Sequence, residues 1–314
     1  MSESAAEGGN VDEPRGVDGH VEFEGYRTWF RVVGEREDPG RLPLLCLHGG
    51  PGATWHHMEP YAQLAEGRRV IFYDQLGCGN SAVAEPHDPA MWTTELYVRE
   101  VDAVRRALGL ERCHVIGHSW GGMLGMAYAI TRPEGLASLV AESSPPSVPL
   151  WLKELDRLRA ELPPDVETTL RRNEADGTTD SAEYETAMMV FYDRHVCRVR
   201  PWPDWVQRTF DGLAANPEVY NTVNGPSEFH VIGPLKDFDV TGELGRIETP
   251  TLLFCGEFDE VTPATVAPAH EGIGGSSFFV MQGCSHMSQA ERPEATLGLI
   301  RGWLAGIEGS LNAG

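Results

Sequence analysis

Residues Val115–Gly122 read Val-Ile-Gly-His-Ser-Trp-Gly-Gly, an apolar run that leads into a Gly-x-Ser-x-Gly motif. The run before the motif suits a short buried strand, and apolar residues then recur at helical spacing through residues 123–130. A serine on a sharp turn between a strand and a helix requires small residues two positions before and two positions after it. Gly117 and Gly121 meet this requirement, so the stretch predicts a nucleophilic Ser119.

Strand-like and helix-like segments alternate on both sides of this motif. The first two strand-like segments are joined at residues 24–25 and favour an antiparallel hairpin at the edge of a sheet. The later ones alternate with helical patterns, such as those over residues 93–108 and 291–307, and this alternation indicates an α/β fold with a mostly parallel central sheet flanked by helices. The segments expected to form strands are residues 21–23, 26–33, 44–47, 69–74, 113–116, 136–141, 250–255 and 276–281.

Residues 148–239 differ in composition and in sequence pattern from the rest of the chain. They are helix-rich and charged, and they are interrupted by Pro163-Pro164 and by Pro201-Trp202-Pro203. We interpret them as a helical cap inserted into a core formed by residues 19–147 and 240–308. A lid over a site excludes water and shapes the pocket, so it is expected to determine substrate selectivity. An unrelated helical domain with its own partner is the alternative.

Composition and charge limit the function further. The chain has 314 residues, of which 41% are hydrophobic and 23% charged, and its formal net charge is −22. This charge argues against nucleic acid and anionic membranes as partners, because both would be repelled. Residues 1–18 are acidic and lack the basic start and apolar centre of a signal peptide, which predicts a disordered leader and a cytoplasmic protein. We expect the last residues, 308–314, to be frayed.

The cysteines and histidines give no sign of a metal site or of another cofactor. The six cysteines form no Cys-x-x-Cys pair, so we expect reduced thiols rather than disulfides or metal ligands. His56 and His57 are adjacent, so their side chains should diverge, and no acidic partner motif accompanies them.

Two further residues complete a catalytic triad with Ser119. Asp259 follows the expected strand over residues 250–255, and His286 follows the strand over residues 276–281. The order Ser-Asp-His along the chain is that of α/β-hydrolases. In such a triad the histidine removes the serine proton and returns it to the leaving group, while the aspartate orients the imidazole. Of the other histidines, we expect His48 and His118 to orient loops, and His56, His57, His87 and His270 to lie at the surface or at helix ends.

A glycine-rich segment, His48–Gly52, follows the expected strand over residues 44–47. In α/β-hydrolases the loop after this strand and the residue after the nucleophile each supply one backbone N–H to the oxyanion hole. We assign Gly50 and Trp120 to these two positions. A glycine-rich turn with no catalytic role is the alternative for the loop.

Taken together, these motifs resemble the proline iminopeptidase family of serine peptidases. The resemblance extends from about residue 21 to residue 303. Residues Asn224–Phe229, which read Asn-Gly-Pro-Ser-Glu-Phe, are similar to the branch that contains the tricorn-interacting aminopeptidase and the L-amino-acid amide hydrolases. The motifs that carry the resemblance are His48–Gly52, Asp74–Ser81, Gly117–Gly122, Gly256–Asp259 and Gly283–His286.

The resemblance implies that two glutamates, Glu228 and Glu260, bind the free α-amino group of the substrate. Carboxylates in a water-poor pocket make charge-assisted hydrogen bonds to a terminal ammonium, which supports this role. Glu260 has an alternative role, capping the helix that starts near Pro263. Residues expected to form apolar walls around a proline ring or a small side chain are Trp120, Phe229 and Trp205.

The predicted function is therefore transfer of an N-terminal aminoacyl group, proline or a small apolar residue, to Ser119, followed by hydrolysis of the acyl-enzyme. The substrate would be a short peptide or a small aminoacyl amide with a free amino terminus, and no cofactor is implied. Three alternatives stay open: an amide hydrolase that trims an aminoacyl group from a secondary metabolite, a carboxylesterase or lactonase, and a non-catalytic binding module.

Overall fold

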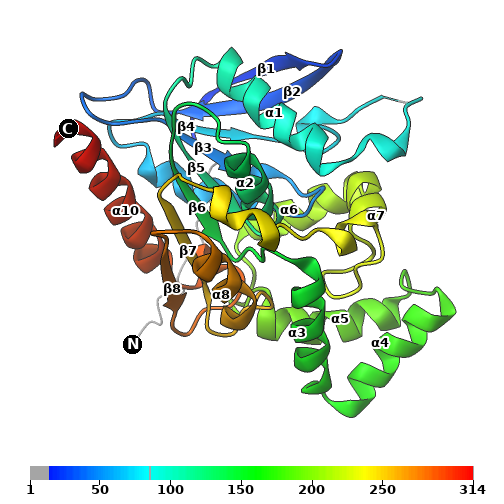
Figure 1. The fold of residues 1–314 in the computed structure, drawn as a ribbon. Helices are drawn as coiled ribbons and strands as arrows, with labels where there is room; N and C mark the ends of the chain where they lie inside the picture. Colours follow the sequence, from blue (N-terminus) through cyan, green and yellow to red (C-terminus); the bar gives the residue numbers. More distant parts are fainter. Residues whose placement is uncertain (1–13, 85, 314) are drawn as a thin grey trace, which may run out of the picture.

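Eight strands form one sheet in the computed structural model, which describes residues 14–84 and 86–313 (Figure 1). Their order across the sheet is β1-β2-β4-β3-β5-β6-β7-β8. The pairs β1–β2 and β2–β4 are antiparallel, and the pairs from β4 to β8 are parallel, which confirms the expected fold class. In chain order the strands are β1 (Val17–Phe23), β2 (Tyr26–Val33), β3 (Leu44–Leu47), β4 (Val70–Tyr73), β5 (Cys113–His118), β6 (Leu136–Glu142), β7 (Thr251–Gly256) and β8 (Ser277–Met281).

Helices cover both faces of the sheet. Successive side chains of a strand point to opposite sides, so a strand in which every residue is apolar needs packing partners on both faces. In β3, Leu45 and Leu47 join the hydrophobic cluster beneath one set of helices, and Leu44 and Cys46 join the cluster on the other face. The first face carries α1 (Thr94–Ala107), α2 (Trp120–Ile130) and α8 (Pro263–Gly272). The second carries η1 (Trp55–Leu64) and α10 (Pro293–Ala313), which follows the short α9 (Ser288–Glu291).

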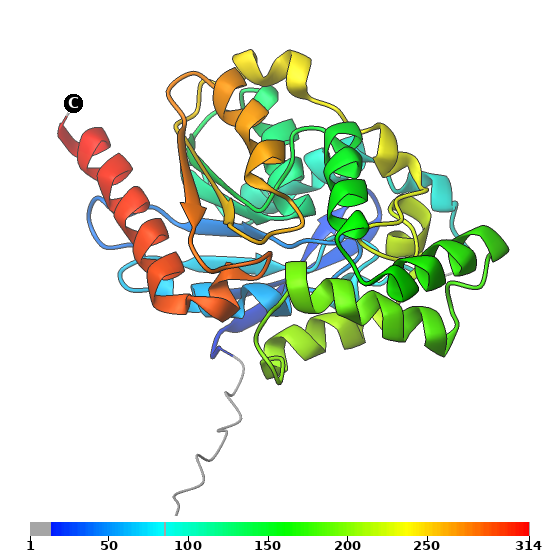
Figure 2. The ribbon, with the colours of Figure 1, turned by 90° about the horizontal axis from the view of Figure 1, so that it is seen from below.

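The segment between β6 and β7 is helical. It enters and leaves the core at one place, where Ser147 and Asp239 pair through a single antiparallel bridge and a hydrogen bond of 3.0 Å. Figure 2 shows its first helices, in green, on the side of the molecule opposite α10, in red. Its helices are α3 (Val148–Ala160), α4 (Pro164–Asp176), α5 (Ala182–His195), α6 (Asp204–Ala215) and α7 (Glu218–Val223), followed by η4 (Pro234–Asp237).

Two segments near the ends of the described residues form regular structure that we did not expect from the sequence. β1 begins at Val17, inside the range expected for the acidic leader; the greater part of that leader, residues 1–13, lies outside the described residues. The expectation of a frayed tail is wrong, because α10 continues to Ala313. Its Glu308 is buried and forms an ion pair with Arg68, with Oε1 2.7 Å from Nη1.

None of the helices within residues 14–84 and 86–313 combines the length and the apolar character needed to cross a membrane.

Candidate active site

Ser119 lies on a strained turn between β5 and α2. Its φ of 56° and ψ of −123° fall in a region that non-glycine residues rarely occupy, and such strain is concentrated at functional sites. The flanking glycines are required by packing. A Cβ on Gly117 would lie 2.1 Å from the carbonyl oxygen of Gly121, and a Cβ on Gly121 would lie 1.9 Å from that of Leu47.

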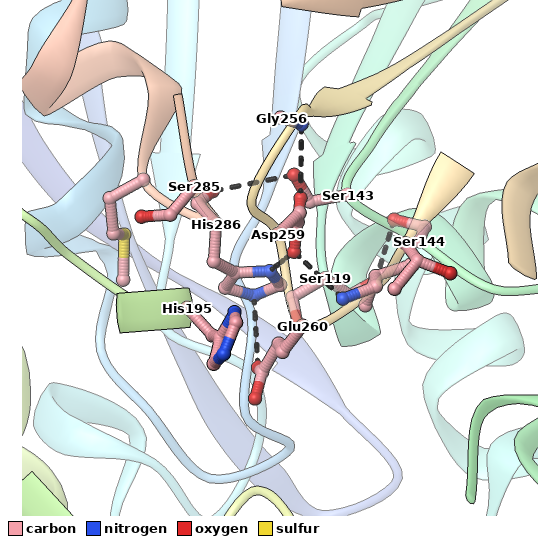
Figure 3. A network of polar contacts seen from close by, with 12 residues as sticks. Ser119, Ser143, Ser144, His195, Gly256, Asp259, Glu260, Ser285 and His286 are labelled. Carbon is pink, nitrogen blue, oxygen red and sulfur yellow. Dashed lines mark hydrogen bonds and ion pairs between the residues drawn. The ribbon is translucent and has the colours of Figure 1, made fainter. Parts of the chain in front are cut away.

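Asp259 and His286 meet beside Ser119 at the carboxyl ends of parallel strands (Figure 3). The Nδ1 of His286 lies 2.8 Å from Oδ1 of Asp259, and both side chains are buried. The backbone amides of Val261 and Gly256 also donate to this carboxylate, at 2.8 and 3.3 Å. Because a carboxylate only accepts, Nδ1 of His286 carries the proton and Nε2 is left for exchange with a hydroxyl.

The structure also brings Glu228 and Glu260 to His286, although they come from different parts of the fold. Glu260 follows β7 and Glu228 follows α7 in the insertion. Glu260 is fully buried, with Oε1 3.8 Å from Nε2 of His286. Glu228 lines the pocket that Ser119 and His286 share, and its Oε1 accepts a hydrogen bond of 2.9 Å from Tyr220.

Both oxygens of Glu260 lack a hydrogen-bond partner within residues 14–84 and 86–313. Glu260 therefore does not cap α8, whose N-cap residue is Thr262. Burial, together with the carboxylates of Glu228 and Asp259, raises the pKa of Glu260 well above its usual range. A buried carboxylate that accepts no hydrogen bond is costly, and a cation that donates hydrogen bonds at this point would remove the cost.

The charge around His286 favours its protonated form. Burial by itself would lower the pKa of His286, but the carboxylates of Asp259, Glu260 and Glu228 outweigh burial and raise it to about 9. In the substrate-free protein these carboxylates therefore favour a second ring proton on His286.

The predicted oxyanion-hole residues both lie next to Ser119. Gly50 lines the same pocket with a φ of +112°, which favours glycine, and a Cβ on the preceding Gly49 would lie 3.2 Å from the Cβ of Ser119. Trp120 is the first residue of α2, and the first N–H groups of a helix have no partner inside that helix. Their assignment to an oxyanion hole stays a prediction.

The apolar walls of the pocket differ from those we expected. The ring of Trp120 points into the core, where its Nε1 donates to Gln75 at 2.8 Å. Phe229 packs in the insertion against Phe191, with ring centroids 4.8 Å apart, and Trp205 is absent from the lining. The direction of each ring depends on contacts with residues far away along the chain, and the local sequence pattern does not reveal these contacts. The apolar residues that line the pocket are instead Ala53, Val196, Phe210, Leu213 and Met287.

Two histidines near the site hold its loops in place. His57 is buried, which contradicts the surface position we expected; its Nε2 accepts a hydrogen bond of 3.2 Å from Gly49, and its Nδ1 donates to Thr54. His118 donates from Nε2 to the carbonyl of His286 at 2.9 Å, in agreement with a loop-orienting role. Burial lowers the pKa of His118 to about 3 and that of His57 well below its usual range, so both rings are neutral.

A third histidine, His195 at the end of α5, was not expected near the site. Its backbone carbonyl accepts hydrogen bonds from the amides of Glu260 and His286, at 3.2 and 3.1 Å. Its Nδ1 donates to the carbonyl of Phe258 at 2.9 Å. Nothing in the sequence indicates these contacts, because residues far apart in the chain form them.

The described residues offer no cluster of three or more His, Cys, Asp or Glu side chains suited to hold a metal ion. All six cysteines lie in that part of the chain, and they are buried and free.

Comparisons with known proteins agree in family and in fold. Residues 43–293 match the family model of the alpha/beta hydrolase fold. The proline iminopeptidase of Heyndrickxia coagulans is 39% identical over 291 residues, covering 93% of this chain and 99% of that protein. The proline iminopeptidase of Lactobacillus helveticus is 37% identical, covering 92% and 97%.

Two solved structures superimpose over nearly the whole chain. The crystal structure of proline iminopeptidase from Mycobacterium smegmatis has a TM-score of 0.88 and 41% identity, covering 94% of this chain and 100% of that one. The crystal structure of VinJ has a TM-score of 0.90 and 43% identity, covering 93% and 99%.

Proposed function

The chain belongs to the proline iminopeptidase family of α/β-hydrolases, and from this premise we propose that it releases an N-terminal amino acid from a peptide or an aminoacyl amide. The released residue is proline or a small apolar residue. In this proposal Ser119, Asp259 and His286 carry out the reaction, and Glu228 and Glu260 bind the amino terminus of the substrate.

The observation that carries the proposal is the carboxylate of Glu260, which is buried in the same site as Glu228 and accepts no hydrogen bond from the described residues. A carboxylate that has lost its water requires a cation or a hydrogen-bond donor in exchange. The ammonium of a free amino terminus supplies both, and it would place the first carbonyl of the substrate near Ser119. An ester or lactone without an amino group would bring no hydrogen-bond donor to the Glu260 oxygens, so we favour an amino-terminal substrate over the esterase alternative.

The proposed chemistry has two halves. His286 takes the proton of Ser119, the serine oxygen attacks the carbonyl carbon, and the backbone N–H groups of Gly50 and Trp120 stabilise the oxyanion. His286 then gives the proton to the leaving amine. In the second half, water attacks the aminoacyl-serine ester with His286 again as general base, and the free amino acid leaves.

The test compares prolyl, alanyl and N-acetyl-prolyl nitroanilides as substrates. We expect cleavage only of the two substrates with a free amino group, and a loss of about 10⁶-fold in kcat for Ser119→Ala. Glu228→Gln and Glu260→Gln should each lower kcat/KM by about 10- to 100-fold, because a hydrogen bond to a charged group contributes about 1.5–3 kcal/mol. Equal cleavage of the acetylated substrate would refute the ammonium site.

The leaving amine is the part that this test does not determine. An aminoacyl amide of a small metabolite presents the same ammonium and the same carbonyl as a peptide does. Comparing prolyl dipeptides with prolyl amides of small amines would separate a peptidase from an amide hydrolase, through the ratio of their kcat/KM values.

A further inference from the structure

His286 lies between two carboxylates, and only one of them is the triad aspartate (Figure 3). Asp259 binds Nδ1 at 2.8 Å, and Oε1 of Glu260 lies 3.8 Å from Nε2. Nε2 is the atom that must accept the proton of the nucleophile. A carboxylate at this distance favours a proton on Nε2, which opposes the function of a general base.

The other titratable groups facing His286 do not cancel this effect. They are Glu228 from the insertion, Glu142 at the end of β6, His118 at the end of β5 and His57 in η1. The two histidines are neutral because of their burial, so they add no positive charge. Burial raises the pKa of Glu142 to about 7, and Glu142 accepts hydrogen bonds from Tyr61 and Ser288. None of these groups brings a positive charge to oppose Asp259 and Glu260, the two carboxylates that lie at the ring nitrogens of His286.

We propose that Glu260 holds His286 in its protonated state until the ammonium of the substrate binds between Glu228 and Glu260 and displaces that proton. This inference rests on the proposed function, because the displacing cation is the amino terminus of the substrate. The exchange is balanced in charge: one ammonium enters the site, and one proton leaves from Nε2 to solvent. Nε2 then carries a free lone pair toward Ser119.

The geometry makes the exchange local. Glu260 has no other partner within the described residues, so its carboxylate turns from the imidazolium to the ammonium without breaking another hydrogen bond. The pKa of about 9 for His286 in the substrate-free protein agrees with this starting state. A free amino terminus would thus be recognised twice, once in binding and once in activating the base. An acylated amino terminus would meet a protonated His286 and react slowly even when bound.

The experiment uses the Ser119→Ala protein and L-prolinol, a cyclic ammonium that lacks the carbonyl group of a substrate. Calorimetric titrations near neutral pH, in buffers of different ionisation enthalpy, count the protons released on binding. We expect about one proton per site, and nearly none when Glu260→Gln is added. Glu271→Gln, an exposed glutamate in α8, is the matched control and should release the same number as the parent.

A second readout does not depend on the Glu260 variant. The ring nitrogen shifts of His286, followed by NMR in Ser119→Ala, should report an apparent pKa that falls by about 3 pH units when prolinol is saturating, which matches the release of about one proton near neutral pH. Binding of prolinol with no proton released and no change in this pKa would overturn the inference and leave the proposed function intact. Prolinol binding no better than N-acetyl-prolinol would instead remove the ammonium site, and the proposed function with it.

Discussion

The backbone amide of His286 donates a hydrogen bond to the carbonyl of His195, 3.1 Å away. The amide of Met287 donates in the same way to Val196, at 3.0 Å. The loop that carries the predicted general base is therefore attached to the end of α5, which belongs to the insertion. Because the same His195 carbonyl accepts from Glu260, the insertion positions both the base and the proposed ammonium ligand.

We predict that His195→Leu lowers kcat about tenfold with little change in KM. The variant keeps the backbone carbonyl but loses the Nδ1 donor to Phe258, the residue before Asp259. A lost hydrogen bond of about 1–1.5 kcal/mol corresponds to about this factor in rate if the triad aspartate is displaced. Steady-state kinetics on the prolyl nitroanilide measure the effect.

His195→Asn provides the control for this prediction. The amide nitrogen of asparagine occupies nearly the position of Nδ1 in histidine, so it should restore most of the lost kcat. Equal losses in the leucine and asparagine variants would show that the imidazole acts only through packing.

Sequence patterns predicted those parts of the site that a short stretch of chain defines. The two flanking glycines predict the turn at Ser119. The strands that precede Ser119, Asp259 and His286 predict that all three lie at the same edge of the sheet. Contacts between distant segments leave no such pattern. His195 lies 91 positions before His286 in the numbering, and its function depends on packing between the insertion and the core.

The same reasoning explains two wrong predictions, the apolar lining of the pocket and the frayed C-terminal segment. Trp120 and Phe229 are apolar and near the motifs, yet their rings fill the core and the insertion. Their direction is set by partners far away in sequence. Glu308 resembled a charged residue in a fraying tail, and only the folded chain brings it to the buried Arg68.

We predict that Glu308→Gln lowers the free energy of unfolding by about 3 kcal/mol at neutral pH, because it leaves the buried Arg68 without its counter-charge. Chemical denaturation measures the change. Glu271→Gln, which alters an exposed glutamate, should change the stability by less than about 0.5 kcal/mol.

The pH dependence of stability gives an independent check on Glu308. Burial would raise its pKa, but His114, Arg68 and the amide of Leu42 outweigh burial and lower it to about 2, from an ordinary value of 4.5. The stabilisation is therefore complete above pH 4.5 and is lost as the pH falls toward about 2. In Glu308→Gln this part of the stability curve should be flatter; an unchanged slope would argue against the ion pair.

We predict that Gly121→Ala prevents folding or costs more than about 4 kcal/mol, since its Cβ would meet the carbonyl oxygen of Leu47 at 1.9 Å. Gly302→Ala is the control in another helix, α10, where a Cβ meets no atom within 4 Å. That change should stabilise the protein by roughly 0.5–1 kcal/mol, because alanine loses less backbone entropy than glycine. Thermal unfolding of both variants distinguishes tight packing at the turn from a general effect of glycine replacement.

The last prediction concerns the loop that carries Gly50. His57 accepts a hydrogen bond from the amide of Gly49 at 3.2 Å, and its other ring nitrogen donates to the carbonyl of Thr54 at 3.0 Å. His57→Leu removes the acceptor, so we expect the loop to shift and kcat to fall roughly 10-fold or more, with the larger part of the loss in kcat rather than in KM. His57→Gln keeps an acceptor in the side chain and should lose less.

A role in positioning the loop predicts that this loss is independent of pH. Burial lowers the pKa of His57 well below its usual range, so the ring stays neutral throughout the range in which the enzyme is assayed. The ratio of kcat between wild type and His57→Leu should therefore be constant from weakly acidic to weakly alkaline pH. A ratio that changes with the protonation of a group near neutrality would mean that His57 takes part in proton transfer, and it would replace the positioning role with a catalytic one.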